Sequence, residues 1–438
     1  MARKIITAID VGSNKITTVI TALDDAQQLP AVIGVCSQPS RGIKKGVVVN
    51  IEEATNAISE SVSAAERMAG ITVSDVFVSI NGEQVTSLNN KGVVAVSDSE
   101  ITVEDTYRAI ENARTLSLPD TLNPIHIIPR EFVVDNQGGI KYPIGMTGSR
   151  LEVETHIITA PNSYWRNIKK CVEQLALHVY DVVFVSWASS LAVLTDTEKE
   201  LGVSLIDIGA GTSSISIFEE GAIAYSGCIP LGGGNITSDL AIGLQVSLEE
   251  AEKIKINMSK LLSNNITKGP NGEDRTPALL RKVEVKEEKK KDEIKKDDLI
   301  DVSVLGIKSQ KEISKSFLRQ IVHARLEEMF ELIKDTVKKS GYNVAMPAGV
   351  VLTGGSALVE DATKVGQSVF GVPCRIGYPS GLSGMVEEIS DPSYSAVQGL
   401  IKHALDDDVD AGSSSSEGGF SFGNIFKKVV SWFKSLLP

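Results

Sequence analysis

The sequence predicts an α/β protein built from two similar halves. Two stretches, residues 5–20 and 205–218, carry one pattern: an apolar strand, an Asp-X-Gly step, a short turn with hydroxyl side chains, and a second β-branched strand. Around them, segments with strand-like periodicity alternate with segments of helix-like periodicity. A repeat of this kind indicates two like halves that face one ligand.

The composition bounds the possible functions. The chain has 438 residues, of which 42% are apolar and 23% charged, enough for about three structural units at roughly 150 residues each. Its net charge of −12 argues against nonspecific nucleic-acid binding by the main body. No apolar run reaches the roughly 18 residues of a membrane span, and the N-terminal apolar run is broken by Asp10, too early for a signal peptide.

Cysteine and histidine patterns exclude two further classes. The four cysteines are far apart and form no C-x-x-C, which is typical of reduced thiols in a cytosol. The five histidines show no metal-ligand spacing, so a zinc site is not expected.

The two repeated turns carry the chemistry of an anion site. Glycine lets backbone amides approach an anion, and successive turn amides form an anion-binding concavity. Ser13, Thr212 and Ser213 add hydroxyl donors, and Asp10 and Asp207 end the first strands, where they could hold Mg²⁺ through its waters. The pair therefore predicts a site for a nucleotide phosphate with its metal. For either turn alone, an ordinary β-hairpin is the competing interpretation.

Two glycine turns follow in the second half. Gly232-Gly233-Gly234 precedes a predicted helix over 236–244, and a helix N-terminus is a natural phosphate site. The predicted strand at 350–353 runs into Gly354-Gly355, whose backbone could lie against a base or ribose.

Periodicity and capping signals place the other elements. The apolar spacing of 52–69 predicts a helix with Ala54, Ile58, Val62 and Ala65 on one face. Ser247 and Glu250 have capping-box character and predict a helix start. We expect a separate α/β unit at 83–161, a long helix at 314–338, and a charged loop or mobile insertion at 264–298, with a basic partner-binding patch as the alternative for that loop.

In this order, the four motifs resemble the actin, Hsp70 and sugar-kinase ATPase superfamily. Within it, the chain is similar to the FtsA family of bacterial actin-like cell-division proteins over nearly its whole length. The matching segments are Gly-Ser-Asn-Lys-Ile at 12–16, Gly-Val-Val-Val-Asn at 46–50, Leu-Ile-Asp-Ile-Gly at 205–209, and the C-terminal tail. The resemblance implies an actin-like two-lobed ATPase fold with the family's inserted 1C domain and a C-terminal amphipathic helix.

The resemblance also implies a division into domains. It assigns 1–82 to domain 1A, continued by 162–195 and 361–405; 83–161 to the inserted domain 1C; 196–246 to domain 2A, continued by 314–360; 247–313 to the small domain 2B; 406–419 to a flexible linker; and 420–438 to a membrane-binding helix.

Site roles carried over from the family cover both halves. Asp10 and Asp207 would organise Mg²⁺. ATP would be bound by Gly12, Ser13, Asn14 and Lys15 on one side, by Gly209, Gly211, Thr212 and Ser213 on the other, by Gly232, Gly233 and Gly234 beside the hinge, by Glu252 and Lys255 near the ribose or base, and by Gly354, Gly355 and Ser356 at the adenosine. A solvated charged helix face is the competing interpretation for Glu252 and Lys255.

One departure concerns hydrolysis. Actin-like ATPases place a Gln or Glu before the second phosphate hairpin to orient the attacking water. Residues 185–190 read Val-Ser-Trp-Ala-Ser-Ser and offer no such side chain. We therefore expect tight ATP binding with weak or negligible ATPase activity, and whether the chain is an enzyme stays open.

The C-terminal segment predicts a helix lying in a membrane interface. Helical spacing gives it one broad apolar face, made by Phe422, Ile425, Phe426, Val429, Trp432, Phe433 and Leu436, with Lys427 and Lys428 largely off that face. A helix that docks on this protein's own body or on a partner is the alternative.

By resemblance, the chain is an ATP-binding division protein that forms homopolymers. It would tether the ring of the tubulin-like FtsZ to the cytoplasmic face of the membrane at the division septum as a peripheral protein. The FtsZ C-terminal peptide would dock on the second-half small domain, and later division proteins would be recruited; no nucleic acid is expected. The alternatives are a pilus-assembly adaptor of the PilM type and a sugar kinase of the same superfamily.

Overall fold

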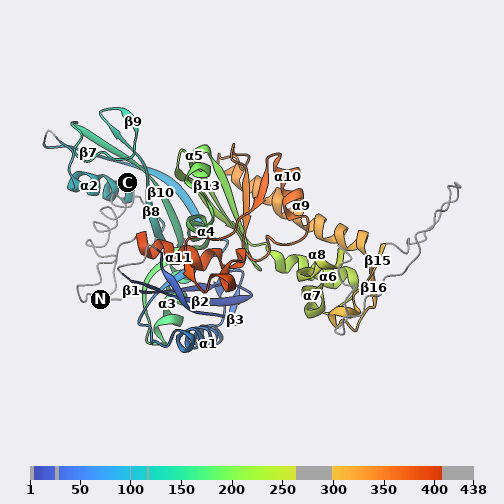
Figure 1. Cartoon of the computed structure of the whole chain (residues 1–438). Helices are drawn as coiled ribbons and strands as arrows, with labels where there is room; N and C mark the ends of the chain where they lie inside the picture. Colours follow the sequence, from blue (N-terminus) through green and yellow to red (C-terminus); the bar gives the residue numbers. More distant parts are fainter. Residues whose placement is uncertain (1–3, 25–28, 99, 116–117, 263–297, 407–438) are drawn as a thin grey trace.

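The protein is an α/β molecule of two lobes, an inserted domain and a small domain. The structure, a computed structural model, describes residues 4–24, 29–98, 100–115, 118–262 and 298–406. Each lobe is built on one sheet, and the inserted domain has a sheet of its own. The inserted domain and the small domain lie at opposite ends of an elongated molecule (Figure 1).

The first lobe is built on a six-stranded sheet. In spatial order its strands are β11 (His178–Phe184), β6 (Asp75–Ile80), β1 (Lys4–Val11), β2 (Lys15–Leu23), β3 (Ala31–Pro39) and β19 (Ser383–Gly384). Alternate side chains of β1 enter different cores, with Ile9 and Val11 on one face and Ile6 and Ala8 on the other. Both faces are therefore covered, by α1 (Ile51–Ala69) and α3 (Asn162–Glu173) on one and by α4 (Val185–Val193) and α11 (Ser395–Asp406) on the other.

Helix α1 forms as the sequence predicts. Asn50 caps its first turn by accepting from the Glu53 backbone N–H, and Gly70 ends it in the left-handed region with φ 69°. The predicted apolar face, Ala54, Ile58, Val62 and Ala65, is buried.

Helices α4 and α11 pack at unusually short range. A Cβ added at Gly399 of α11 would lie 1.7 Å from the Ala188 carbonyl oxygen of α4. Only glycine allows this approach, so the last described helix is held directly against the helix that leads out of the first lobe.

The inserted domain is a four-stranded sheet covered by one helix. Its strands are β7 (Thr86–Ala95), β10 (Arg150–Pro161), β8 (Leu122–Val134) and β9 (Gln137–Ile140), and α2 (Val103–Arg114) packs on it. Thr102 and Asp105 form a reciprocal capping box at the start of α2. Ile125, Ile158 and Ala160 belong to the first-lobe core, so this domain has an apolar root in the first lobe.

The second lobe is built on a five-stranded sheet. Its strands are β14 (Ala222–Ile229), β13 (Ser213–Glu219), β12 (Val203–Ile208), β17 (Val350–Thr353) and β18 (Cys374–Ile376), and α10 (Ala362–Phe370) packs beside it. Residues 361–376, which we expected in the first-half domain, contribute α10 and β18 to this lobe instead. The reason is that β18 extends the sheet by pairing in parallel with β17, and the chain returns to the first sheet only at β19.

The small domain adjoins the second lobe and shares its core. It contains α6 (Gly233–Leu244), α7 (Leu248–Ile256), α8 (Met258–Leu262), β15 (Leu299–Asp301), β16 (Glu312–Ser314) and the first part of α9 (Lys315–Lys339). We expected α6 and the start of α9 in domain 2A, but they pack with α7 and α8 in one core. The predicted capping box is present, since Ser247 and Glu250 exchange side-chain to backbone hydrogen bonds of 3.1 and 3.2 Å.

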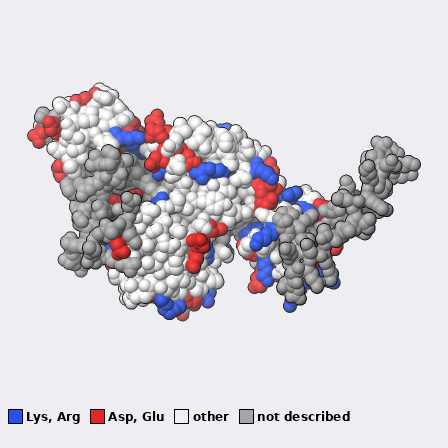
Figure 2. Space-filling view, viewed as in Figure 1, with Lys and Arg blue, Asp and Glu red and all other residues white. Residues whose placement is uncertain are grey.

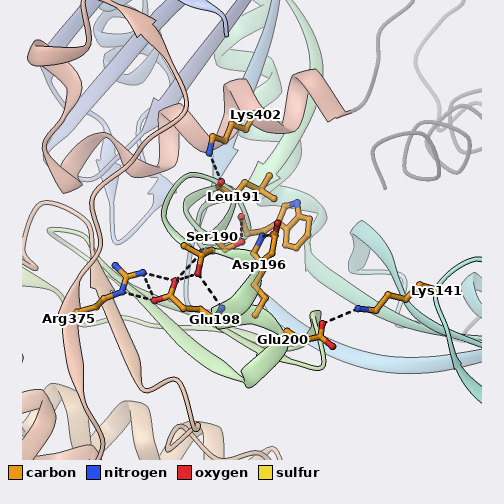
Figure 3. Close-up of polar contacts among 11 residues, drawn as sticks. Lys141, Ser190, Leu191, Asp196, Glu198, Glu200, Arg375 and Lys402 are labelled. Atoms are coloured by element: carbon orange, nitrogen blue, oxygen red, sulfur yellow. Dashed lines mark hydrogen bonds and ion pairs between the residues drawn. The ribbon is translucent and has the colours of Figure 1, made fainter. Parts of the chain in front are cut away.

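The chain crosses between the lobes through α4 and α5 (Asp196–Leu201). Lys402 of α11 donates to the Leu191 carbonyl over 3.0 Å, and Arg375 contacts Glu198 through two nitrogens at 2.7 and 2.8 Å. Figure 3 shows these contacts gathered around the crossing, so both lobes hold it in place.

Several predicted features lie outside the described residues. These are most of the charged segment at 264–298 and the linker and amphipathic helix after Asp406. Among the helices that the structure describes, none combines the length and the apolar character needed to cross a membrane. On the face shown in Figure 2, acidic and basic side chains lie in small mixed groups.

Candidate functional site

Asp10 ends β1 at the side of the first lobe that faces the second hairpin. The Val11 backbone N–H donates to Ser79 Oγ over 2.8 Å, and Ser79 in turn donates to Asp10 Oδ1 over 2.7 Å. Burial raises the pKa of Asp10, while the Ser79 hydrogen bond and the Lys15 charge oppose that rise. The carboxylate is thus oriented by a neighbouring strand and balanced by one cation.

Lys15 starts β2 and lies across the turn from Asp10. Its Nζ donates to Ser393 Oγ over 2.8 Å and lies 4.0 Å from the centre of the Tyr394 ring. Burial lowers the pKa of Lys15, and the carboxylates of Asp10 and Asp391 oppose that shift. The first hairpin therefore contacts the short helical turn η4 (Pro392–Tyr394), which leads into α11.

Asp207 holds the matching position at the end of β12. It is 6% exposed, and Ser189 of α4 donates to its Oδ2 over 2.5 Å. Burial raises the pKa of Asp207 to about 7; the Ser189 hydrogen bond lowers it and the Asp10 charge raises it. The two aspartates from the two lobes therefore sense each other's charge.

Three turns meet where the lobes approach each other. The Gly46 N–H, in the tight turn between β4 (Ile43–Lys44) and β5 (Val47–Val48), donates to Ser13 Oγ over 2.8 Å. A Cβ added at Gly211 of the second hairpin would lie 2.8 Å from Ser13 Oγ and 3.1 Å from the Lys45 Cα. The predicted pairing of the two hairpin tips is thus present, with the 45–46 turn wedged beside them.

Asn81 is a site residue that the sequence analysis missed. Its Nδ2 donates to Thr212 Oγ1 over 3.0 Å, and its Oδ1 accepts from Ser214 Oγ over 2.9 Å and from the Gly82 N–H. A first-lobe residue thus orients the second hairpin. An Asn-Gly pair directly after a strand was the available signal.

The glycine turn before α6 abuts the second hairpin. The N–H groups of Gly233 and Gly234 donate to the carbonyls of Gly209 and Ala210 over 2.9 and 2.8 Å. A Cβ at Gly232 would lie 2.6 Å from the Gly209 oxygen, so this approach requires glycine.

Residues 354–356, which follow β17, also pack against the second hairpin. Ser356 Oγ donates to the Gly209 carbonyl over 3.1 Å, and a Cβ at Gly354 would lie 2.4 Å from Asp207 Oδ1. Gly354 has φ +84°, a conformation that favours glycine. A Cβ at Gly355 would meet Ser393 at 3.2 Å, so η4 lies beside this turn as well.

Lys255 and Glu252 of α7 reach the glycine turn. Lys255 Nζ lies 2.7 Å from Glu252 Oε2 and donates to the Gly233 carbonyl over 3.2 Å and to Thr237 Oγ1 over 2.9 Å. The Lys255 side chain is only 7% exposed. The competing interpretation, a solvated charged face, is therefore wrong for Lys255, because a buried lysine needs the partners that it has here.

Two predicted phosphate residues are placed differently. Ser213 Oγ donates to the Leu231 carbonyl over 2.8 Å and is turned into the fold, whereas Asn14 is exposed at the hairpin tip. The turns at 209–211, 232–234 and 354–356 contact one another, and Gly211 lies against Ser13 of the first lobe.

These residues fit a nucleotide with Mg²⁺. Mg²⁺ usually keeps several waters and is held by one or two carboxylates plus substrate phosphates, which two aspartates facing glycine turns could provide. Within the part of the chain that the structure describes, no cluster of three or more His, Cys, Asp or Glu residues could hold a metal by itself.

Comparison with known proteins gives two family matches. A model described as "Cell division protein FtsA" matches residues 204–399, and one described as "SHS2 domain inserted in FTSA" matches residues 82–159, the inserted domain. A protein named cell division protein FtsA from Pseudomonas aeruginosa is 35% identical over 96% of this chain and 94% of its own length. One of the same name from Borreliella burgdorferi is 36% identical over 92% and 91%.

A solved structure confirms the fold. The PilM-PilN type IV pilus biogenesis complex contains a chain that matches with a TM-score of 0.58 and 12% identity, over 91% of this chain and 98% of that one. At that identity the likeness concerns the fold alone, whereas the curated relatives share a third of their residues over nearly the full length. The chain therefore belongs to the FtsA family of cell-division proteins.

Proposed function

We propose that the chain binds ATP with Mg²⁺ between its two lobes and that the nucleotide controls its assembly. The observation that carries this proposal is the pair Asp10 and Asp207. Ser79 and Ser189 orient them from neighbouring elements, Gly354 lies against Asp207, and Gly211 of the second hairpin lies against Ser13 of the first. None of the groups that shift the pKa of Asp207 is a cation, so a bound metal would supply the missing positive charge.

The turns divide the proposed nucleotide contacts. Lys15 and the backbone of residues 12–14 would meet the phosphates from the first lobe, and residues 209–213 from the second. Residues 232–234 and 354–356 would lie along the nucleoside, with Lys255 positioning the 232–234 turn through the Gly233 carbonyl. The Ser213 hydroxyl would take no direct part, because Leu231 accepts its hydrogen bond.

We propose that hydrolysis is slow. Helix α4 faces Asp207 through Ser189, and its residues 185–193 contain neither Gln nor Glu. A water near the γ-phosphate would therefore lack the side chain that orients the nucleophile in fast ATPases. Steady-state phosphate release of many turnovers per minute would contradict this proposal.

The binding proposal is tested by calorimetry on the full chain. We expect Asp207→Asn to weaken Mg·ATP binding about 10- to 100-fold, the usual effect of removing a group that acts on a metal through its waters. Asp196→Asn is the matched control, because the Asp196 carboxylate is fully exposed on the same lobe. Equal affinity of wild type and Asp207→Asn, or binding that ignores Mg²⁺, would overturn the proposal.

At the level of the cell, we propose that the polymer tethers FtsZ to the membrane at the division septum. Family membership supports a role in division. The apolar and basic pattern of residues 420–438 supports peripheral attachment to the cytoplasmic face, and many tails on one polymer would add avidity. We propose the small domain as the dock for the FtsZ C-terminal peptide.

Two experiments test the tether. Deleting residues 420–438 should abolish sedimentation with vesicles that contain anionic lipid, while Mg·ATP affinity stays at the wild-type value as the control. Unchanged sedimentation would refute membrane binding by this segment. An immobilised FtsZ C-terminal peptide should retain the full chain, and failure to retain it would exclude that dock.

A further inference from the structure

The inserted domain touches both lobes, and the two contacts differ in kind. The chain enters it from the first lobe, and Ile125, Ile158 and Ala160 at its base are part of the first-lobe core. On its other side, edge strand β7 faces β14, the edge strand of the second-lobe sheet. Apolar packing roots this domain in the first lobe. Toward the second lobe, Ile128 of β8 adds one apolar contact with a cluster that includes Leu205 and Ile223, and polar side chains make the hydrogen bonds.

Two side chains of β7 bond the backbone of β14. The Ser226 N–H donates to Ser87 Oγ over 2.8 Å, and Ser87 Oγ donates to the Ser226 carbonyl over 2.7 Å. Two residues further on, Asn89 Nδ2 donates to the Ala224 carbonyl over 3.1 Å. Because Ser87 and Asn89 lie on the same side of β7, their side chains pair the two edges antiparallel in place of a direct ladder.

Three further groups complete this polar seam, which we define as Ser87, Asn89 and His156 against Ala224, Ser226 and Tyr342. His156 Nδ1 lies 2.7 Å from Asn89 Oδ1, and its Nε2 lies 2.9 Å from Ser226 Oγ. Asn89 Nδ2 also donates to the Tyr342 hydroxyl over 2.6 Å.

His156 stays neutral within the seam. It is fully buried, and burial, together with the nearby Arg130 charge, lowers its pKa to about 3. A neutral ring with the proton on Nδ1 can donate to Asn89 and accept from Ser226. Each seam side chain therefore has a hydrogen-bond partner, and none of the seam groups carries a charge.

A second, outer contact adds little strength. Lys141 Nζ lies 3.0 Å from Glu200 Oε2 of α5, and Figure 3 shows the pair reaching from the inserted domain to the second lobe. Both side chains are half exposed, so the solvent screens their attraction. The seam, by contrast, is largely buried and contains several directional hydrogen bonds between the inserted domain and the second lobe.

We propose that the polar seam is a releasable latch between the lobes. The inserted domain moves with the first lobe, because the chain enters it from there and Ile125, Ile158 and Ala160 are buried in the first-lobe core. It contacts the second lobe through directional hydrogen bonds. When the lobes separate, the seam is the contact that breaks, because its polar groups can form hydrogen bonds with water instead, whereas the apolar side chains cannot. None of the seam residues is among those proposed to contact the nucleotide.

Hydrogen exchange on the full chain tests the latch. Asn89→Ala removes the bonds to Ala224, Tyr342 and His156 but leaves Ser87, the acceptor of the Ser226 N–H, in place. Faster exchange of the Ser226 amide in this variant would therefore report opening of the seam. We expect an increase of about tenfold or more, because buried polar groups lose their partners.

The adjacent asparagine provides the matched control. Asn90 Nδ2 donates to the Ala113 carbonyl within the inserted domain. Asn90→Ala should speed exchange in α2 and leave the Ser226 amide at the wild-type rate. Equal rates at Ser226 in Asn89→Ala and wild type, or equal increases in both variants, would overturn the proposal.

A more conservative variant tests the proposal in case Asn89→Ala misfolds. Tyr342→Phe removes only one hydroxyl from the second-lobe side of the seam. It should raise Ser226 exchange by a smaller factor than Asn89→Ala. Small-angle scattering should give a larger radius of gyration for Asn89→Ala than for Asn90→Ala if the lobes part, and identical radii would count against the latch.

Discussion

The two Asp-X-Gly hairpins have similar backbone arrangements but different charges around their aspartates. In each, an aspartate ends a strand and is oriented by a serine from a neighbouring element, Ser79 for Asp10 and Ser189 for Asp207. Asp10 has Lys15 across the turn, whereas the charge that acts on Asp207 is that of Asp10 itself. The first half thus contains its counter-charge. No cation is among the groups that shift the pKa of Asp207 in the second half, and the proposed Mg²⁺ would supply that charge.

The largest expected effect comes from adding a side chain at Gly354, where it would crowd Asp207. Gly354→Ala would put a Cβ 2.4 Å from Asp207 Oδ1 and 2.7 Å from the Ile208 oxygen, at φ +84°. We expect about 3 kcal/mol of lost unfolding free energy and loss of nucleotide binding. Gly371→Ala is the control, since it shares a positive φ of 73° but has nothing within 4 Å, and it should cost only about 1 kcal/mol. Equal losses in denaturant melts would show that crowding at Asp207 is unimportant.

Asp207 should also give the second half a distinct pH dependence. Its pKa of about 7 in the folded protein lies above its ordinary value of 3.8, so the folded state holds a proton that the unfolded state has lost. Between these values, without Mg²⁺, the free energy of unfolding should fall as the pH rises. Asp207→Asn should flatten this slope more than Asp10→Asn does. Chemical denaturation at several pH values measures it, and equal slopes in the two variants would contradict the asymmetry.

Removing Lys15, the cation beside Asp10, should make the charge around Asp10 more like that around Asp207. Lys15→Met deletes the charge beside Asp10 and the bond to Ser393, and it should raise the pKa of Asp10 further. We expect about tenfold weaker Mg·ATP binding, measured by calorimetry. Ser393→Ala removes the bond alone and should change the affinity less. If both variants lose affinity equally, the lysine acts through Ser393 and not through its charge.

The smallest expected effect is a difference in stability between alanine variants of two buried serines in α4. Ser189 donates to Asp207, whereas Ser186 Oγ has no hydrogen-bond partner among the described residues. Ser189→Ala should cost about 1 kcal/mol of stability and raise the pKa of Asp207, and Ser186→Ala should be near neutral. Thermal melts of the two variants measure the difference. A larger loss for Ser186→Ala would mean that orientation of Asp207 is not what Ser189 contributes.

Local patterns predicted the parts of the fold that local physics controls. The apolar face of α1 and the capping box at Ser247 follow from periodicity and from backbone donors that need a partner, and both are present. Periodicity also predicted the two strands and the turn of each hairpin. It likewise predicted that Asp10 and Asp207 lie at strand ends.

Long-range placement was harder to predict. The apolar pattern of residues 361–376 fits either lobe, and only the pairing of β18 with β17 decides it. Ser79, Asn81 and Ser189 enter the site because strands and helices distant in sequence bring them there, and a single serine or asparagine carries no signal of its own. The polar seam likewise depends on which sheet edges meet.

The close packing of Gly399 against Ala188 joins the end of the described chain to the site. Ala188 precedes Ser189, the residue that orients Asp207, and α11 ends at Asp406, from where the chain runs on toward its C-terminus. A molecule anchored by that end would carry mechanical tension along α11, through a backbone contact too tight to slip, into α4. Such tension would reach Ser189 and, through its hydrogen bond, the carboxylate of Asp207.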